Sequence, residues 1–85
     1  MARFELVFKR SVAKDLRAIP RPDVARILRC FEALSEDPRP PGCIKLSGLD
    51  RYRVRVGVYR IVYAIEENRL VVTVVKVAHR KRAYR

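Results

Sequence analysis

Polar and hydrophobic positions alternate along residues 52–63, which read Tyr-Arg-Val-Arg-Val-Gly-Val-Tyr-Arg-Ile-Val-Tyr. Such alternation of β-branched and aromatic residues with polar ones is typical of strands that bury one face. Gly57 interrupts the pattern, and glycine readily adopts the positive φ of a tight turn or bulge. The pattern therefore predicts a β-hairpin, or two strands meeting at a tight bend. One face is apolar, and Arg53, Arg55 and Arg60 lie on the other.

One further strand is predicted before this hairpin in the sequence, and one after it. Residues 3–9 alternate as a first strand, with Phe4, Leu6 and Phe8 on one side. Residues 70–78 form a nearly continuous β-branched run, which is typical of a strand buried on much of both faces. Residues 45–50 are predicted to be a loop or a short strand.

Parity along the last strand assigns its two faces. Odd positions from Val71 to His79 share one face, and even positions from Val72 to Arg80 share the other. Cationic side chains are rarely buried in a core. We therefore expect Lys76 and Arg80 on the open face of the sheet, with the three hairpin arginines, and His79 on the core side as a structural histidine.

The segment between the first strand and the hairpin predicts two helices. Val12, Leu16 and Ile19 recur at helical spacing after Ser11, a candidate N-cap. The region Pro20-Arg21-Pro22 ends that helix and begins a second, which must end before Pro38. The apolar stripe of the second helix comprises Val24, Ile27, Leu28, Phe31 and Leu34.

The order of these elements is strand, helix, helix and then three strands. The economical arrangement is an α+β fold in which a two-helix hairpin packs on one face of a mostly antiparallel sheet of about four strands. At 85 residues, the chain is expected to form a single domain spanning residues 1–85.

The net charge of the chain indicates which kinds of molecule it would bind. The chain has 20 Lys and Arg against 9 Asp and Glu, a formal net charge of +11. So much like charge repels itself in a compact fold, and a polyanion such as nucleic acid, or an acidic protein, would relieve the repulsion.

Motifs for other classes of protein are missing. There is neither a signal-peptide pattern nor an apolar run long enough to cross a membrane, so we expect a cytoplasmic protein with no membrane partner. Two Cys, one His and no CxxC spacing argue against a metal site, and no cofactor motif is present. Cys30 and Cys43 are expected to be reduced.

Four features, taken in order, resemble the RelE toxins of toxin–antitoxin modules. They are the first strand running into Ala13-Lys14-Asp15-Leu16, the Lys45-Leu46-Ser47-Gly48 segment, the hairpin sequence, and the final His79-Arg80 followed by Tyr84. The likeness covers essentially the whole chain. It implies a compact α+β toxin that enters the ribosomal A site, cleaves mRNA by attack of the RNA 2′-OH without a metal, and is silenced by a small antitoxin, RelB-like or otherwise acidic and partly disordered.

The resemblance also implies roles for individual residues. Arg53 and Arg55 match strand positions where RelE toxins place basic groups, often Lys; Arg60 matches an arginine that contacts the scissile phosphate. Arg80 matches an arginine near the leaving oxygen, and Tyr84 matches an aromatic that stacks on a base. Two departures stand out, namely Arg in place of Lys and a chain that stops one residue after Tyr84. Expected contacts to backbone phosphates come from Lys45, Lys76, Lys81 and Arg82.

Arginine is suited to stabilising charge on a phosphate but not to transferring protons. Its planar fork donates two hydrogen bonds to phosphate oxygens and stays charged, but its high pKa makes it a poor general base. We therefore expect electrostatics and positioning to dominate, with the ribosome holding the mRNA near attack geometry.

Other functions, and other roles for these residues, are also consistent with the sequence. The fold could serve a ParE-like toxin that acts on DNA gyrase without cutting RNA, or a non-catalytic RNA-binding module. For individual residues, Arg53 and Arg55 could be a solvated strand face, and Arg60 could pair with Glu5 or Glu66.

Overall fold

The computed structural model of the chain describes residues 3–48 and 50–81, and its strands form one sheet. Along the chain the elements are β1 (Glu5–Phe8), α1 (Arg10–Arg17), α2 (Arg21–Glu36), β2 (Ile44–Lys45), β3 (Tyr52–Val56), β4 (Tyr59–Glu66) and β5 (Val71–His79). The strand order is β1-β5-β4-β3-β2, with β1 parallel to β5 and the other neighbours antiparallel.

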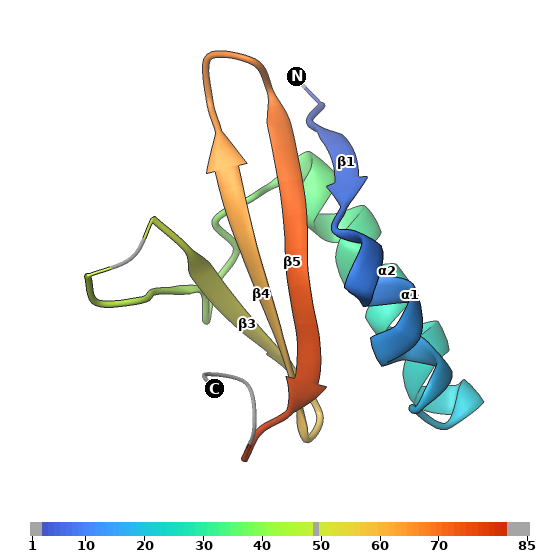
Figure 1. Cartoon of the computed structure of the whole chain (residues 1–85). Helices are drawn as coiled ribbons and strands as arrows, with labels where there is room; N and C mark the ends of the chain where they lie inside the picture. Colours follow the sequence, from blue (N-terminus) through green and yellow to red (C-terminus); the bar gives the residue numbers. More distant parts are fainter. Residues whose placement is uncertain (1–2, 49, 82–85) are drawn as a thin grey trace.

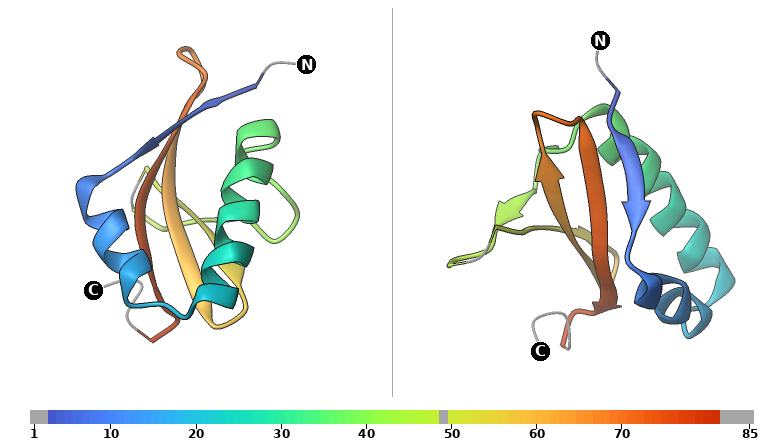
Figure 2. Two further views of the ribbon diagram at one scale, coloured as in Figure 1. Left: turned by 90° about the vertical axis from the view of Figure 1, so that its right-hand side faces the viewer. Right: turned by 45° about the horizontal axis from the view of Figure 1, so that its top comes forward.

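This arrangement confirms the predicted α+β class, with one correction. The sheet has five strands rather than about four, because the short β2 pairs with β3 through Ile44 opposite Arg53 and Lys45 opposite Tyr52. Figures 1 and 2 show both helices on the same side of the sheet. Neither of the helices found in the described part of the chain has the length and apolar character needed to cross a membrane.

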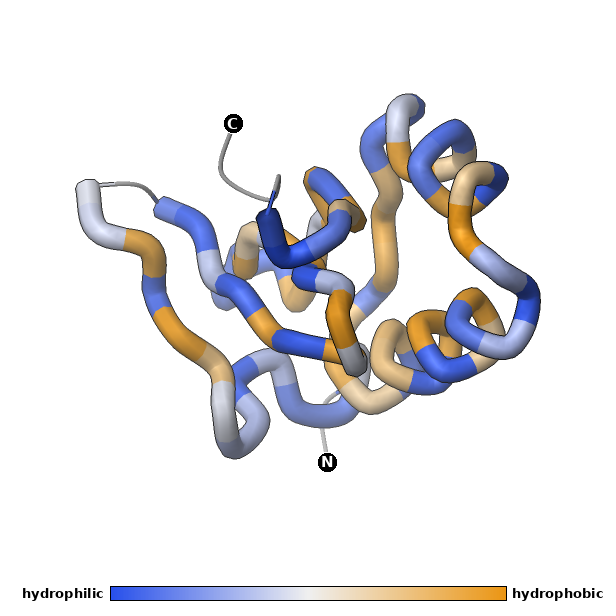
Figure 3. Tube along the Cα trace, turned by 90° about the horizontal axis from the view of Figure 1, so that it is seen from below, coloured by the Kyte–Doolittle hydropathy of each residue, from blue (hydrophilic) through white to orange (hydrophobic). Residues whose placement is uncertain are grey.

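The core lies between the helices and the sheet. From α2, Ile27, Phe31 and Leu34 are at most 2% exposed, and Val12 of α1 is equally buried. These residues pack against the helix-facing side chains of the three longest strands, which are Val54, Ile61, Tyr63, Val72, Val74 and Val77. Figure 3 shows the apolar residues in orange, interspersed with polar ones in blue along the helices and strands. Hydrophobic burial along one face of each element therefore holds the two layers together.

Two details of the helices differ from the sequence-based expectation, and the proline boundary between the helices agrees with it. Ser11 does not cap α1, because the helix begins at Arg10 and its N-cap is Lys9, which makes no side-chain capping bond. Leu28 lies off the buried stripe and is 48% exposed. Pro22 lies in the first turn of α2, as predicted, but Pro20 is the N-cap.

A bulge in β5 corrects the predicted faces of this strand. Lys76 lies opposite Val62, but Val74 lies opposite Tyr63, so Val75 is an extra residue in the ladder. A bulge reverses the alternation of side chains along a strand. Val72 and Val74 are fully buried in the core, so the even positions before Val75 face the helices, contrary to the parity rule. After the bulge, the odd-numbered Val77 faces the core as predicted.

Candidate nucleic-acid interface

The predicted hairpin is present, and its turn is as short as a hairpin turn can be. Val56 pairs with Tyr59, which leaves Gly57 and Val58 as the two turn residues. Gly57 has φ 59°, the positive value that the first central residue of a type II′ turn requires. Two-residue turns of this kind match the twist of the flanking strands. The tight turn therefore fixes how side chains on β3 and β4 oppose each other.

Four cationic side chains lie in two cross-strand rows that are neighbours on one face of the sheet. In the first row Arg55 lies opposite Arg60, and Arg60 lies opposite Ala78 of β5. The second row contains Arg53, Val62 and Lys76 in that order. Residues that face each other across strands project from the same side of a sheet. The rows alternate with Val54 and Ile61, which are buried under the helices, so the cations project from the opposite, open face.

The four cations differ in exposure. Arg55 is exposed, and Arg60 and Lys76 are half-buried. Arg53 is buried, with 8% of its surface exposed, although it projects from the open face. Arg53 and Arg55 border a hollow of about 500 Å³ that also touches Leu34 of α2 and Ile44 of β2. Arg55 is therefore the most accessible of the four for a ligand on the open face.

Two hydrogen bonds bring Arg80 to the Arg55–Arg60 row. The backbone N–H of Arg80 donates to the carbonyl of Val58 in the hairpin turn, at 2.7 Å. Nη1 of Arg60 donates to the carbonyl oxygen of Arg80, at 2.8 Å. The segment that follows β5 is thus attached to the hairpin. Arg60 and Arg80, which are far apart in the sequence, lie at one end of the sheet.

The ion pairs found in the described chain lie away from these cations. Ion pairs join Arg3 to Glu32 and Glu36, Arg26 to Asp23, Arg39 to Glu67, and Arg69 to Glu66. Within residues 3–48 and 50–81, none of these pairs involves Arg55, Lys76 or Arg80. The charges of Arg55, Lys76 and Arg80 are therefore available to an anion from outside.

His79 is not in the core, which corrects the expectation from parity. It is exposed as the last residue of β5. Its ring meets that of Tyr59 edge-on, with centroids 6.0 Å apart, and its Nδ1 accepts a hydrogen bond from the backbone N–H of Lys81 at 3.4 Å. The imidazole thus helps to shape the segment that carries Arg80.

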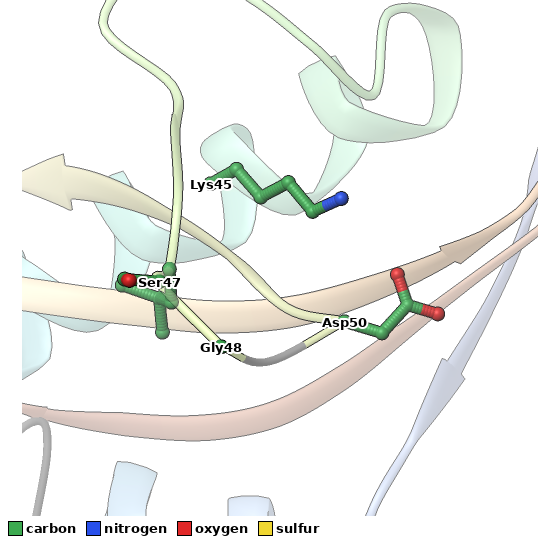
Figure 4. Close-up of a pocket in the computed structure, with 5 residues that line it drawn as sticks. Lys45, Ser47, Gly48 and Asp50 are labelled. Carbon is green, nitrogen blue, oxygen red and sulfur yellow. The ribbon is translucent and has the colours of Figure 1, made fainter.

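The remaining sequence-predicted contacts are spread over the molecule. Lys45 lies in β2 and shares an open hollow of about 460 Å³ with Ser47, Gly48 and Asp50. Figure 4 shows the Lys45 amine and the Asp50 carboxylate extending to the same side of that loop. Lys45 is therefore separated from the Arg55–Arg60 row by the length of β3. Lys81 follows Arg80 and is exposed, while Arg82 and Tyr84 lie outside the described residues.

The opposite end of the hairpin has a second polar cluster, which the sequence analysis did not identify. The hydroxyl of fully buried Tyr63 donates to the carbonyl of Pro38 at 2.7 Å and lies 3.2 Å from Sγ of Cys43. Burial, and then the adjacent Cys43 thiol, raise the pKa of the Tyr63 phenol above its ordinary value. Tyr63 stacks on Tyr52 with centroids 5.9 Å apart. Cys30 and Cys43 are both free thiols.

Arg39 extends this cluster to the surface. Its guanidinium lies 5.1 Å from the centre of the Tyr52 ring, donates to the Tyr52 hydroxyl at 3.1 Å, and pairs with Glu67 at 2.6 Å. The contacts connect the loop after α2 with β3 and with the turn between β4 and β5. No sequence motif predicts these contacts of Arg39, because the residues that make them lie far apart along the chain.

The chemistry open to the Arg55–Arg60–Arg80 cluster is anion binding. Guanidinium groups donate paired hydrogen bonds to phosphate oxygens and remain charged at all physiological pH values. In the described part of the chain, His, Cys, Asp and Glu side chains nowhere gather in groups of three that could hold a metal ion. The cluster is therefore suited to binding a phosphodiester.

Comparison with known proteins places this chain in a family. The model of the ParE toxin of type II toxin–antitoxin systems, parDE, matches residues 6–84. A Methanocaldococcus jannaschii protein that bears the name toxin RelE1 is 28% identical over 87 residues, covering 98% of this chain and 97% of the relative.

Solved structures give the same result. The archaeal RelE–RelB complex from Pyrococcus horikoshii OT3 contains a chain that matches with a TM-score of 0.84 and 30% identity, over 98% of this chain and 100% of that one. The isolated E. coli RelE toxin matches with a TM-score of 0.79 and 25% identity, over 95% of this chain and 88% of that one. The chain therefore belongs to the ParE toxin family of type II toxin–antitoxin systems and is a RelE-type toxin of the RelE/ParE superfamily.

Proposed function

We propose that this toxin inhibits translation by cutting mRNA on the ribosome. The observation that carries the proposal is the meeting of Arg55, Arg60 and Arg80 at one end of the open sheet face, through the hairpin register and the Arg60–Arg80 hydrogen bond. A cluster of guanidiniums without a carboxylate partner at Arg55 or Arg80, in the described chain, suits a phosphodiester. Action on ribosomes would place the protein in the cytoplasm.

The cleavage step is a transesterification within the RNA. The 2′ oxygen forms a bond to the neighbouring phosphorus and loses its proton, and the bond from phosphorus to the 5′ oxygen breaks as that oxygen gains a proton. Arg55, Arg60 and Arg80 would stabilise the negative charge that builds on the phosphorane and on the leaving oxygen. The ribosome would align the 2′ oxygen for attack.

Other residues would hold the message beside this cluster. Lys76 lies beside Val62 in the neighbouring row, and Lys81 follows Arg80 directly. Contacts of this kind fix the register of a nucleic acid without reading its sequence. In this proposal Lys45 and Arg82 touch backbone phosphates, and Tyr84 stacks on a base, as the RelE resemblance implies.

A cognate antitoxin is the second part of the proposal. The relative from P. horikoshii is described as a complex of RelE with RelB. The net charge of +11 favours an acidic partner chain, which would neutralise the open face. Such a chain, partly disordered when free, would fold over the toxin as it binds.

Reconstituted translation tests the proposal directly. We expect the wild-type chain to cut mRNA on programmed ribosomes and to cut naked RNA poorly at physiological salt. Arg80→Ala should lower the cleavage rate by roughly 10²–10³, the effect typical of removing one donor to a developing negative charge. Arg69→Ala is the matched control, because it removes an arginine from the distant β4–β5 turn. Equal cleavage by wild type and Arg80→Ala would exclude the proposed role of the cluster.

An alternative target is favoured by one observation. The family model that matches residues 6–84 is that of the ParE toxin, which favours the ParE-like alternative of the sequence analysis, a toxin that acts on DNA gyrase without cutting RNA. If the alternative is correct, the purified chain will inhibit DNA supercoiling and leave programmed ribosomes and their mRNA intact. A non-catalytic RNA-binding module would bind RNA with a log–log salt slope of about −0.7 per phosphate contacted and cut neither substrate.

A further inference from the structure

The Ala13-Lys14-Asp15-Leu16 motif has no part in the chemistry proposed above, yet one of its residues reaches β5. Oδ2 of Asp15 accepts a hydrogen bond from the backbone N–H of Val77 at 3.1 Å. Asp15 is half-buried, and α1 packs against β5 at this place. The contact therefore joins the first helix to the last strand through a charged acceptor, which strengthens a hydrogen bond relative to a neutral one.

The contact occurs where β5 loses its neighbouring strand. β1 pairs with β5 only as far as Phe8 opposite Val74, and the backbone N–H of Lys9 makes one more bond, to the carbonyl of Val74 at 2.9 Å. The chain then turns into α1 at Arg10, while β5 continues to His79. A half-buried N–H without a partner strand must find another acceptor. Asp15 supplies that acceptor for Val77, directly after the bulge at Val75.

The same part of β5 leads into the cationic cluster. Val77 lies opposite Ile61, and the next row contains Arg60 opposite Ala78. Arg80 follows and is held from the other side by the carbonyl of Val58 and by Nη1 of Arg60. The end of β5 is thus fixed on its outer edge by Asp15 and on its inner edge by the hairpin. Loss of the outer attachment would let the bulged strand end shift relative to Arg60.

We propose that Asp15 is a positioning residue that holds the end of β5 so that Arg80 lies beside Arg60. This inference rests on the proposed function, in which Arg80 acts on the phosphate. Asp15 itself touches no substrate and acts through Val77. Because a small misplacement of a charged group can reduce a rate by up to about 10²-fold, we expect Asp15→Ala to lower ribosomal mRNA cleavage by about 10- to 100-fold.

Two measurements test the inference, one of them independent of activity. Amide hydrogen exchange followed by NMR reports the Val77 N–H directly. Asp15→Ala should speed exchange at Val77, and Asp15→Asn, which keeps an acceptor oxygen, should restore most of the protection and most of the cleavage rate. Asp23→Ala is the matched control, because it removes a carboxylate from the first turn of α2 and should leave Val77 unchanged.

A double-mutant cycle separates positioning from a general loss of stability. In single-turnover cleavage, Asp15→Ala should slow the wild-type chain but add little to Arg80→Ala, since the two act through one group. A full additional loss in the Arg80→Ala background, or unchanged exchange at Val77, would overturn the inference. Should Asp15→Ala not fold, Asp15→Glu keeps the charge and displaces the acceptor, and it should show the same dependence on Arg80.

The outcomes also distinguish this inference from the proposed function. If Arg80→Ala impairs cleavage and Asp15→Ala does not, the inference alone is wrong. If the wild-type chain cuts no ribosome-bound mRNA, the proposed function fails and the positioning role fails with it, while Val77 exchange still reports whether the contact exists.

Discussion

At the Tyr63 end of the β3–β4 hairpin, the cation Arg39 has three partners: the Tyr52 ring, the Tyr52 hydroxyl and the Glu67 carboxylate. At the Gly57 end, Arg55 lies opposite another arginine, Arg60, and Arg80 is drawn toward them by its backbone. One end therefore places arginine among groups that neutralise it. The other end gathers like charges.

The difference shows that arginine has two kinds of environment at the two ends of one hairpin. Like charges placed opposite each other across strands destabilise a sheet. That cost is offset elsewhere, by the buried core and by clusters such as the one around Tyr63. An arrangement that repels itself in the free protein is the one that gains most from a bound phosphate. We therefore expect mutations at the two ends to have separable effects.

The largest expected effect is on activity at the Gly57 end. Arg60→Ala should reduce ribosomal mRNA cleavage by roughly 10²–10³, because it removes a donor to the phosphate and also the hydrogen bond that holds the Arg80 carbonyl. Arg39→Ala removes the same charge from the other end and should leave cleavage close to the wild-type rate. Single-turnover cleavage and thermal unfolding of both variants provide the comparison. Comparable losses of cleavage in the two variants would contradict the division between the ends.

The next effect is on stability at the Tyr63 end. Tyr63→Phe deletes the hydroxyl that donates to the carbonyl of Pro38, at a fully buried position. An unsatisfied buried acceptor costs about 1–3 kcal/mol, so the free energy of unfolding should fall by about that amount. Urea unfolding measures the change, and cleavage at a temperature where both proteins are folded should not differ. A variant as stable as the wild type would show that this hydrogen bond contributes little.

A pH series sharpens the assignment to Tyr63. Because its pKa is raised in the folded state, the unfolded chain loses the phenolic proton first as the pH rises above about 10, the ordinary value for tyrosine. The native state then binds more protons than the unfolded state, so stability is retained below that pH and lost above it. The wild-type chain should lose up to about 1.4 kcal/mol more per pH unit than Tyr63→Phe in this range. Parallel stability curves for the two proteins would refute the raised pKa.

The smallest effect is expected for the exposed ion pair. Glu67→Gln removes the charge that pairs with Arg39, but both side chains are substantially exposed. Exposed pairs contribute about 0–1 kcal/mol, and salt weakens them further. The difference in thermal unfolding between wild type and Glu67→Gln should therefore shrink as ionic strength rises. A loss larger than that of Tyr63→Phe would show that the Arg39 contacts, and not the buried hydroxyl, stabilise this end.

Local pattern was sufficient to predict much of the fold. Alternation around Gly57 predicted the hairpin, and helical spacing predicted the buried positions Ile27, Phe31 and Leu34, because these signals depend only on neighbouring residues. The same alternation predicted that Arg55 and Arg60 would share a face. The class of the fold and the cationic face could therefore be predicted from the sequence alone.

Features that depend on contacts between residues far apart in the sequence could not be predicted from local pattern. No glycine marks the bulge at Val75, so parity assigned Val72 and Val74 to the wrong face. The burial of Arg53 and the contact of Asp15 with Val77 both depend on how separate elements pack. The roles of Arg80 and Tyr84 came from family resemblance, since a run of basic residues by itself indicates only a phosphate-binding surface.

The place of β5 in the sheet has a consequence for the cell that makes this toxin. β5 is the last strand to be synthesised, yet it lies between β1, the first, and β4. Until β5 has been made, β1 lacks its partner and the hairpin has no Arg80 beside it. Pairing between the two ends of a chain is also slow, because a long loop must close first. Each new copy would thus bring Arg80 beside the hairpin only after β5 has been made and has paired, which gives an antitoxin time to reach it.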